Sequence, residues 1–139
     1  MRVRATRELL APREDVWAFL DEPRHLADWW PGIAAVEPDR RGLAPGARWQ
    51  VRRPPRPTLF RRAGAQDLVL VRRVERLVLV EWHLTAGRLD VELRLEETRP
   101  DRTRATLAVE RPVLLGPVRE LPRRALARLH ALVQTAASL

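Results

Sequence analysis

The chain has 139 residues, of which 45% are hydrophobic, with no cysteine and a formal net charge of +8. This length suits a single domain over residues 1–139 with one hydrophobic core, and the lack of cysteine excludes disulfides and thiolate chemistry. No run of about 18 uncharged apolar residues occurs and the N-terminus lacks the apolar core of a secretory signal, so we expect a cytoplasmic protein with no membrane span.

The N-terminal third predicts one strand followed by two short helices. Residues 2–10 alternate weakly between polar and apolar, which indicates a strand, and Pro12 ends it. Acidic residues after Arg13 favour the first turn of a helix, which Pro23 terminates because the residue before a proline avoids the helical region. A second short helix is expected over residues 24–29.

The middle of the chain predicts a series of antiparallel strands. The expected strands cover residues 33–36, 47–53, 67–74, 77–85 and 88–98, followed by a last strand that carries Ala105, Leu107 and Val109. The strand over residues 88–98 alternates most clearly, with Leu89, Val91, Leu93 and Leu95 on its apolar face. Prolines in residues 53–66 predict a loop, with a short element at Leu59–Phe60 left open.

The C-terminal segment predicts one long amphipathic helix over residues 117–137. Apolar residues recur at spacings of three and four along it: Val118, Leu121, Ala125, Leu129, Leu132 and Ala136. Pro122 indicates either a kink or the true start of this helix. The order of elements predicts an α+β fold, in which a curved antiparallel sheet of about six to seven strands packs its single apolar face on the long helix.

Several segments resemble a known superfamily. They are APREDVW at 11–17, LDEP at 20–23 and WWPGI at 29–33, with weaker matches at Gly46, at 79–82 and in the Leu/Ala-rich terminal helix. Together they resemble the SRPBCC superfamily, also called START-like or Bet v 1-like, in its polyketide cyclase/dehydrase branch. The resemblance covers the whole chain. It implies a helix-grip fold with an apolar cavity, but not the ligand, because one fold serves many functions.

The residue inventory limits the chemistry that the chain could perform. Cysteine, lysine and tyrosine are absent, and Ser138 near the C-terminus is the single serine. The three histidines lie on separate elements without a partner at metal-ligand spacing. We therefore expect no catalytic nucleophile, no metal and no cofactor. His25 and Asp28 share a helix face as a potential general base at the cavity rim, although the interpretation that we favour is an exposed pair with no role.

Tryptophan is the informative residue type, with five in the chain beside two phenylalanines. Trp49 and Trp82 fall on the inward parity of their strands. Trp29 and Trp30 are adjacent, so we expect one to pack in the core and the other to line or gate a cavity mouth. The candidate ligand-binding residues are Trp29, Trp30, Trp49, Trp82, Leu93, Leu121, Ala125 and Leu129. They are expected around a cavity between the sheet and the C-terminal helix.

These features favour binding of an apolar small molecule, such as a lipid, polyketide or isoprenoid-like compound. A polyketide cyclase or dehydratase is the first alternative, and an Arg or His inside the cavity would support it. An RNA- or protein-binding module is the second, which a cluster of Arg52, Arg53, Arg56, Arg61 and Arg62 would support. A homodimer is left open.

The charge pattern favours compositional bias over a binding site. All 26 basic residues are arginine, spread over expected strands and helices alike. We therefore expect no specific nucleic-acid partner, and any such binding should be non-specific and weaken steeply with added salt.

Overall fold

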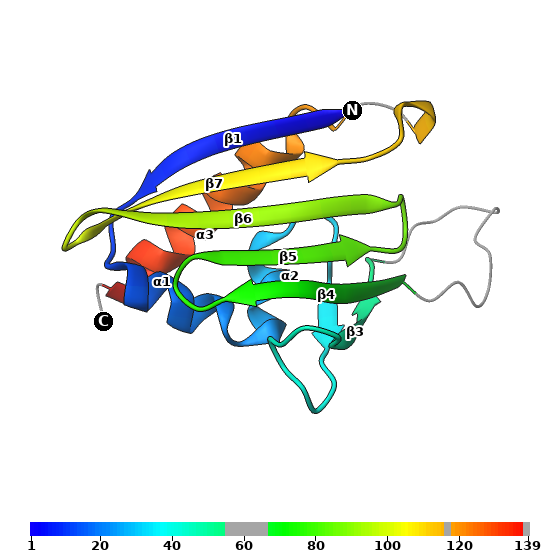
Figure 1. Cartoon of the computed structure of the whole chain (residues 1–139), viewed down its shortest axis with the longest axis horizontal. Helices are drawn as coiled ribbons and strands as arrows, with labels where there is room; N and C mark the ends of the chain where they lie inside the picture. The colour runs from blue at the N-terminus through cyan, green and yellow to red at the C-terminus, as the bar shows by residue number, and fades with distance from the viewer. Residues whose placement is uncertain (55–66, 116–117, 138–139) are drawn as a thin grey trace.

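The computed structural model describes residues 1–54, 67–115 and 118–137, and they contain one curved sheet of seven strands (Figure 1). The strands are β1 (Arg2–Leu9), β2 (Ala35–Glu37), β3 (Arg48–Arg52), β4 (Asp67–Glu75), β5 (Leu79–Leu84), β6 (Leu89–Arg99) and β7 (Arg102–Glu110). Their order across the sheet is β1-β7-β6-β5-β4-β3-β2, and every pair is antiparallel. The expected α+β helix-grip fold is confirmed.

Alternation of polar and apolar residues in the sequence determines the dry face of the sheet, that is, the apolar face buried against the helices. Leu89, Val91, Leu93 and Leu95 of β6 are all buried, as their spacing predicted. Val80, Trp82 and Leu84 of β5 are buried on the same face, whereas Glu81 and His83 lie on the other face and are only partly buried. Because strand side chains alternate between faces, each of these strands contributes every second residue to the core.

Two strands begin two residues later than expected: β2, expected over residues 33–36, starts at Ala35, and β5, expected over residues 77–85, starts at Leu79. For β5 the reason is Leu77, whose φ of 69° lies in the left-handed region that a strand cannot contain. Residues 76–78 form the turn instead. The predicted loop over residues 53–66, with its short element at Leu59–Phe60, lies outside the described residues from residue 55 onward.

The helices follow from simple stop and start signals. Helix α1 (Arg13–Leu20) carries Glu14 and Asp15 in its first turn, and the 3-10 turn η1 (Pro23–His25) starts at a proline. Helix α2 (Leu26–Trp29) ends before Pro31. A further 3-10 turn, η2 (Val113–Leu115), precedes the C-terminal helix.

The C-terminal helix α3 (Leu121–Ala137) is shorter than the predicted range of 117–137. Residues 116 and 117 are outside the described residues, and Val118 lies before the helix. Pro122 occupies the first turn, where its missing N–H leaves no hydrogen bond unmade, so of the two expected roles it marks the start.

The buried face of α3 also differs from the predicted stripe. Ala125 and Leu129 are buried, but so are Leu126 and Val133, which the stripe omitted. Leu121 and Leu132 are only half-buried, and the side chain of Ala136 is outside the described residues. The helix is therefore rotated relative to the expected face, with positions 122, 125, 126, 129 and 133 inward.

The helices divide the dry face of the sheet between them. Helix α3 lies behind the sheet and packs on β1 and β7, while η1 and α2 approach β2 (Figure 1). Helix α2 also contacts α3, so the helices form one continuous second layer. Among the helices in the described part of the chain, none has the length and hydropathy that a bilayer-crossing helix needs.

A buried carboxylate ties the β3 end of the sheet to β4 and β5. Asp67 is 6% exposed, and its Oδ2 accepts hydrogen bonds from Arg53 Nε at 2.9 Å and Nη2 at 2.8 Å. Its Oδ1 accepts from Thr85 Oγ1 at 3.1 Å and from the Ala86 backbone N–H at 2.8 Å. Thr85 Oγ1 in turn accepts from Leu68 N–H at 2.9 Å. Both carboxylate oxygens of Asp67 thus have partners.

We expect Asp67→Ala to lower the free energy of unfolding by about 1–3 kcal/mol, because the half-buried Thr85 hydroxyl, the Ala86 backbone N–H and the Arg53 guanidinium lose their shared acceptor. Urea denaturation measures this loss. The control is Asp101→Ala, which removes an exposed ion pair with Arg102 and should change stability by less than about 1 kcal/mol. Equal effects of the two variants would contradict a structural role for Asp67.

A second prediction concerns pH. Burial and the nearby charge of Arg7 lower the pKa of His130 from its ordinary value of 6.5. The unfolded chain therefore binds a proton at a pH where the folded chain does not, so this residue makes stability fall as pH drops below about 6.5. The free energy of unfolding is measured by urea denaturation at pH 7 and at pH 5. Between these two pH values it should fall less for His130→Gln than for the parent protein, and an equal fall would contradict this assignment.

Candidate functional site

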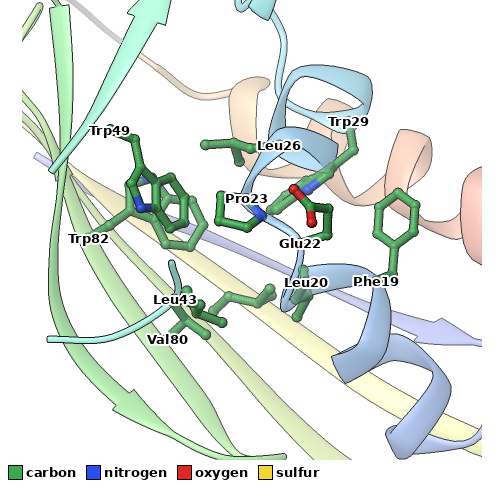
Figure 2. A pocket seen from close by; sticks show the side chains of 11 residues that line it. Phe19, Leu20, Glu22, Pro23, Leu26, Trp29, Leu43, Trp49, Val80 and Trp82 are labelled. Atoms are coloured by element: carbon green, nitrogen blue, oxygen red, sulfur yellow. The ribbon is translucent and has the colours of Figure 1, made fainter. Parts of the chain in front are cut away.

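A pocket opens between η1, α2 and the inner face of the sheet (Figure 2). The cavity itself is small, about 20 Å³, although the empty space counted together with the open solvent at its mouth is about 340 Å³. The lining residues are Phe19, Leu20, Glu22, Pro23, Leu26, Trp29, Leu43, Trp49, Val80, Trp82 and Leu93. All but Glu22 are apolar or aromatic, so the wall is almost wholly hydrophobic.

The two sides of the pocket have different origins. Figure 2 shows Trp49 and Trp82 on the sheet side, with Pro23 and Leu26 projecting toward them from the helical side. The helical side exists because Pro23 starts η1 directly after α1, which turns the chain across the sheet. Strand parity supplies the other side, since inward positions of β3, β5 and β6 carry Trp49, Trp82 and Leu93.

The expectation that the adjacent Trp29 and Trp30 cannot both face the core is wrong, because both are buried, at 2% and 3% exposure. Trp29 lines the pocket, whereas Trp30 packs outside it against Trp29 and Trp82. Helix α2 ends at Trp29, and Trp30 has an extended backbone with φ −86° and ψ 120°. This change of backbone conformation allows both side chains to point inward.

The tryptophans form a mutually perpendicular cluster. Trp82 meets Trp29 at a centroid distance of 6.1 Å and Trp30 at 5.6 Å, with interplanar angles of 89° and 71°. Trp29 and Trp30 are 5.6 Å apart at 79°. Edge-to-face contacts of this kind stabilise aromatic pairs beyond simple burial. The aromatic wall of the pocket is therefore held rigidly.

The indole N–H groups of the two strand tryptophans differ. Trp49 Nε1 donates to the Gly42 carbonyl at 2.9 Å, which ties β3 to the loop before it. Trp82 Nε1 is buried and has no hydrogen-bond partner. Such unpaired buried donors are uncommon in folded proteins and require an explanation.

The structure brings together half of the candidate ligand-binding residues. Trp29, Trp49, Trp82 and Leu93 line the pocket. Trp30 is outside the lining and packs against Trp29 and Trp82. The three candidates on α3, Leu121, Ala125 and Leu129, are also outside it. Helix α3 covers β1 and β7, whereas the pocket faces β3, β5 and β6.

Seven lining residues were not proposed from the sequence: Phe19, Leu20, Glu22, Pro23, Leu26, Leu43 and Val80. Most of them come from α1, η1 and α2. Val80 had a usable signal, because it shares the inward parity of Trp82. The helical residues had none, since amphipathic spacing identifies a buried face but does not show whether that face borders free space.

Glu22 is the ionisable residue in the pocket lining, and it lies at a helix start. Its Oε1 accepts a hydrogen bond from the Arg24 backbone N–H at 3.2 Å, as an N-cap does. The Arg24 guanidinium lies 3.6 Å from the same oxygen. Arg and His, which would have supported the cyclase alternative, are not among the lining residues.

The histidines make local contacts. The His25 ring stacks on Phe19 at 4.2 Å, and its Nδ1 lies 2.9 Å from the Phe19 carbonyl oxygen, so it braces α1 against η1. His83 Nδ1 lies 2.8 Å from Asp90 Oδ1 on the outer face of the sheet. Within the described ranges, no three His, Asp or Glu residues gather as a metal site.

Of the proposed arginine cluster, Arg56, Arg61 and Arg62 are outside the described residues.

The model of a protein family described as "Polyketide cyclase / dehydrase and lipid transport" matches residues 1–136. No curated protein sequence matches the chain significantly. Solved structures do: the protein XoxI from Bacillus cereus is 11% identical with a TM-score of 0.71, the alignment covering 98% of this chain and 97% of that one.

Two further solved structures show the same fold. Protein NE0264 from Nitrosomonas europaea is 19% identical with a TM-score of 0.68, covering 100% of this chain and 97% of that one. Norcoclaurine synthase from Thalictrum flavum, a point mutant bound to a transition-state analogue, is 16% identical with a TM-score of 0.68, covering 99% and 96%. At these identities, the similarity establishes the shared fold alone.

A matched pair of leucines tests the position of the pocket. Leu93 of β6 and Leu107 of β7 are directly opposite each other and almost fully buried, but only Leu93 lines the pocket. Leu107→Ala should lower the free energy of unfolding by about 2–5 kcal/mol, the usual range for a packed site. In the same urea melts, Leu93→Ala should lower the free energy of unfolding by clearly less, because one side of Leu93 already borders the pocket and makes fewer packing contacts there. A larger loss for Leu93→Ala would mean that the pocket is closed in solution.

Proposed function

Because the chain belongs to the family described as polyketide cyclase / dehydrase and lipid transport, we propose that it binds an apolar small molecule in the pocket beneath η1 and α2. The observation that carries this proposal is the lining itself, in which three tryptophans and seven other apolar residues surround a space open to solvent. Lipids, polyketides and isoprenoid-like compounds are the ligand types that such a wall suits.

The chemistry of the wall supports binding by burial of apolar surface. Each Å² of apolar ligand surface removed from water contributes roughly 25 cal/mol before ordering costs are subtracted. Flat tryptophan faces add stacking contacts to planar ligands at little entropic cost, because the perpendicular cluster already holds Trp29 and Trp82 in place. The wall is therefore organised before any ligand arrives.

The size of the pocket limits the ligand. Small-molecule pockets commonly enclose about 300–1,000 Å³, whereas the cavity volume here is about 20 Å³, room for roughly one water molecule. We therefore propose that side chains on the η1 and Leu43 side of the lining move aside to admit a compact ring system or one end of a longer chain.

This location differs from the cavity expected between the sheet and α3. The inward residues of α3, including Ala125, Leu126 and Leu129, are at most 1% exposed and belong to the packed core. A ligand in the pocket described here would contact η1 and α2 in place of α3. The difference matters for mutagenesis, because substitutions on α3 would report on stability and not on binding.

Binding is tested by blocking the pocket. We expect the parent protein to bind at least one member of a size-graded panel of neutral polycyclic compounds and fatty alcohols, measured by calorimetry and by shifts in tryptophan fluorescence. Leu43→Trp fills the mouth and should abolish that binding. Leu10→Trp places the same side chain at a partly exposed position outside the pocket and should leave binding unchanged.

Native mass spectrometry of protein purified from its own host complements the panel, since a co-purifying compound would identify the ligand. The proposal would be overturned if the whole panel failed to bind and the protein carried no small molecule. Binding that persists in Leu43→Trp at full strength would contradict the assigned pocket.

A further inference from the structure

We propose that Trp82 Nε1 is the hydrogen-bond donor that recognises the ligand, so the site selects neutral apolar compounds carrying an acceptor oxygen at their buried end. This inference rests on the proposed function and specifies the ligand class. Trp82 lines the pocket, it is 4% exposed, and its indole N–H has no hydrogen-bond partner among the residues that the structure describes.

Burial of the Trp82 indole N–H without an acceptor is energetically unfavourable. An indole N–H exposed to water is always hydrated, and burying it without an acceptor loses that hydrogen bond. A phenylalanine at the same position would avoid the cost. The neighbours of Trp82 across the strands are Val71 and Val91, whose side chains offer no acceptor. A ligand oxygen would restore the lost hydrogen bond, and a pure hydrocarbon would not.

The contrast with Trp49 shows that the fold can satisfy an indole in this pocket. Both tryptophans lie on the sheet side of the wall (Figure 2). Trp49 Nε1 has the Gly42 carbonyl as its acceptor at 2.9 Å and is used to hold the preceding loop. That donor is occupied, whereas the Trp82 donor is unpaired within the described residues. Because Trp82 Nε1 has almost no accessible surface, a ligand oxygen reaches it only when the side chains around it move.

The other polar group of the wall limits the ligand's charge. Glu22 lines the same pocket, and its partners are the Arg24 backbone N–H and guanidinium. An anionic ligand would be repelled by this carboxylate and would need to desolvate its own charge in an apolar wall. A ketone, quinone, lactone or ether oxygen accepts a hydrogen bond without either cost. The combination of one free donor and one acidic residue thus favours neutral oxygen-bearing molecules.

The test compares molecules that differ by one oxygen. Two pairs are used, 1-indanone with indane and 9-fluorenone with fluorene, and affinities are measured by calorimetry. For the pair that fits the pocket, the affinities of ketone and hydrocarbon are first corrected for their different solubility in water. After this correction, the parent protein should bind the ketone about tenfold more tightly, which is the effect of one neutral hydrogen bond. In ¹H–¹⁵N spectra, the Trp82 indole signal should move downfield with the ketone only.

Two variants remove the donor. Trp82→Phe keeps an aromatic ring, and benzothienylalanine at position 82 keeps the full indole shape with sulfur in place of the N–H, so loss of packing is separated from loss of the donor. Both should bind ketone and hydrocarbon with equal preference. Trp17→Phe, at a buried residue outside the pocket lining, is the control and should retain the ketone preference.

The outcomes are distinguishable. Equal binding of ketone and hydrocarbon by the parent protein, with an unmoved Trp82 signal, would overturn this inference and leave the proposed function intact. An upfield Trp82 signal that no ketone moves would assign the N–H to the face of a neighbouring indole and would also overturn it. Failure of both pairs and of the wider panel to bind would overturn the proposed function, and this inference with it.

Discussion

The architecture depends on one geometric constraint: the dry face of a seven-stranded sheet is wider than a single helix can cover. Strands are spaced about 4.8 Å apart, so seven of them span roughly 29 Å, whereas a helix with its side chains is about 10–12 Å across. Helix α3 therefore covers the β1 and β7 side and leaves the remaining strands exposed. The segment from α1 through α2 must cover them, and its packing decides where free space remains.

That segment covers the sheet with short pieces and not with one long helix. Pro23 divides it and the Pro31-Gly32 pair follows its end, where Gly32 has a φ of 87°, which only glycine adopts without strain. Short elements joined by turns cannot interdigitate with a curved sheet as closely as a continuous helix does. The pocket and the unpaired indole of Trp82 both occur beneath this divided layer.

Structural features that depend on local periodicity could be predicted from the sequence, whereas features that depend on tertiary contacts could not. Inward parity of β5 and β6 was readable, so Trp82 and Leu93 were correctly assigned to the dry face. The rotation of α3, which buries Leu126 and Val133, was not readable, because its apolar residues extend over more than one face. Trp29 and Trp30 were expected not to enter the core together because they are adjacent, but the helix ends between them and the backbone becomes extended at Trp30. The position of the pocket depends on which strands α3 covers, and no local pattern encodes that choice.

The ion pair between Arg53 and Asp67 has a consequence for how this end of the sheet is held together. The two residues bracket the connection from β3 to β4, so the sheet is clamped at both points where that connection leaves it. Because both partners belong to the described residues next to β3 and β4, the pair holds the end of one strand beside the start of the next, independently of the chain that joins them. A substitution of either partner should therefore loosen the edge of the sheet at this end before it affects the core.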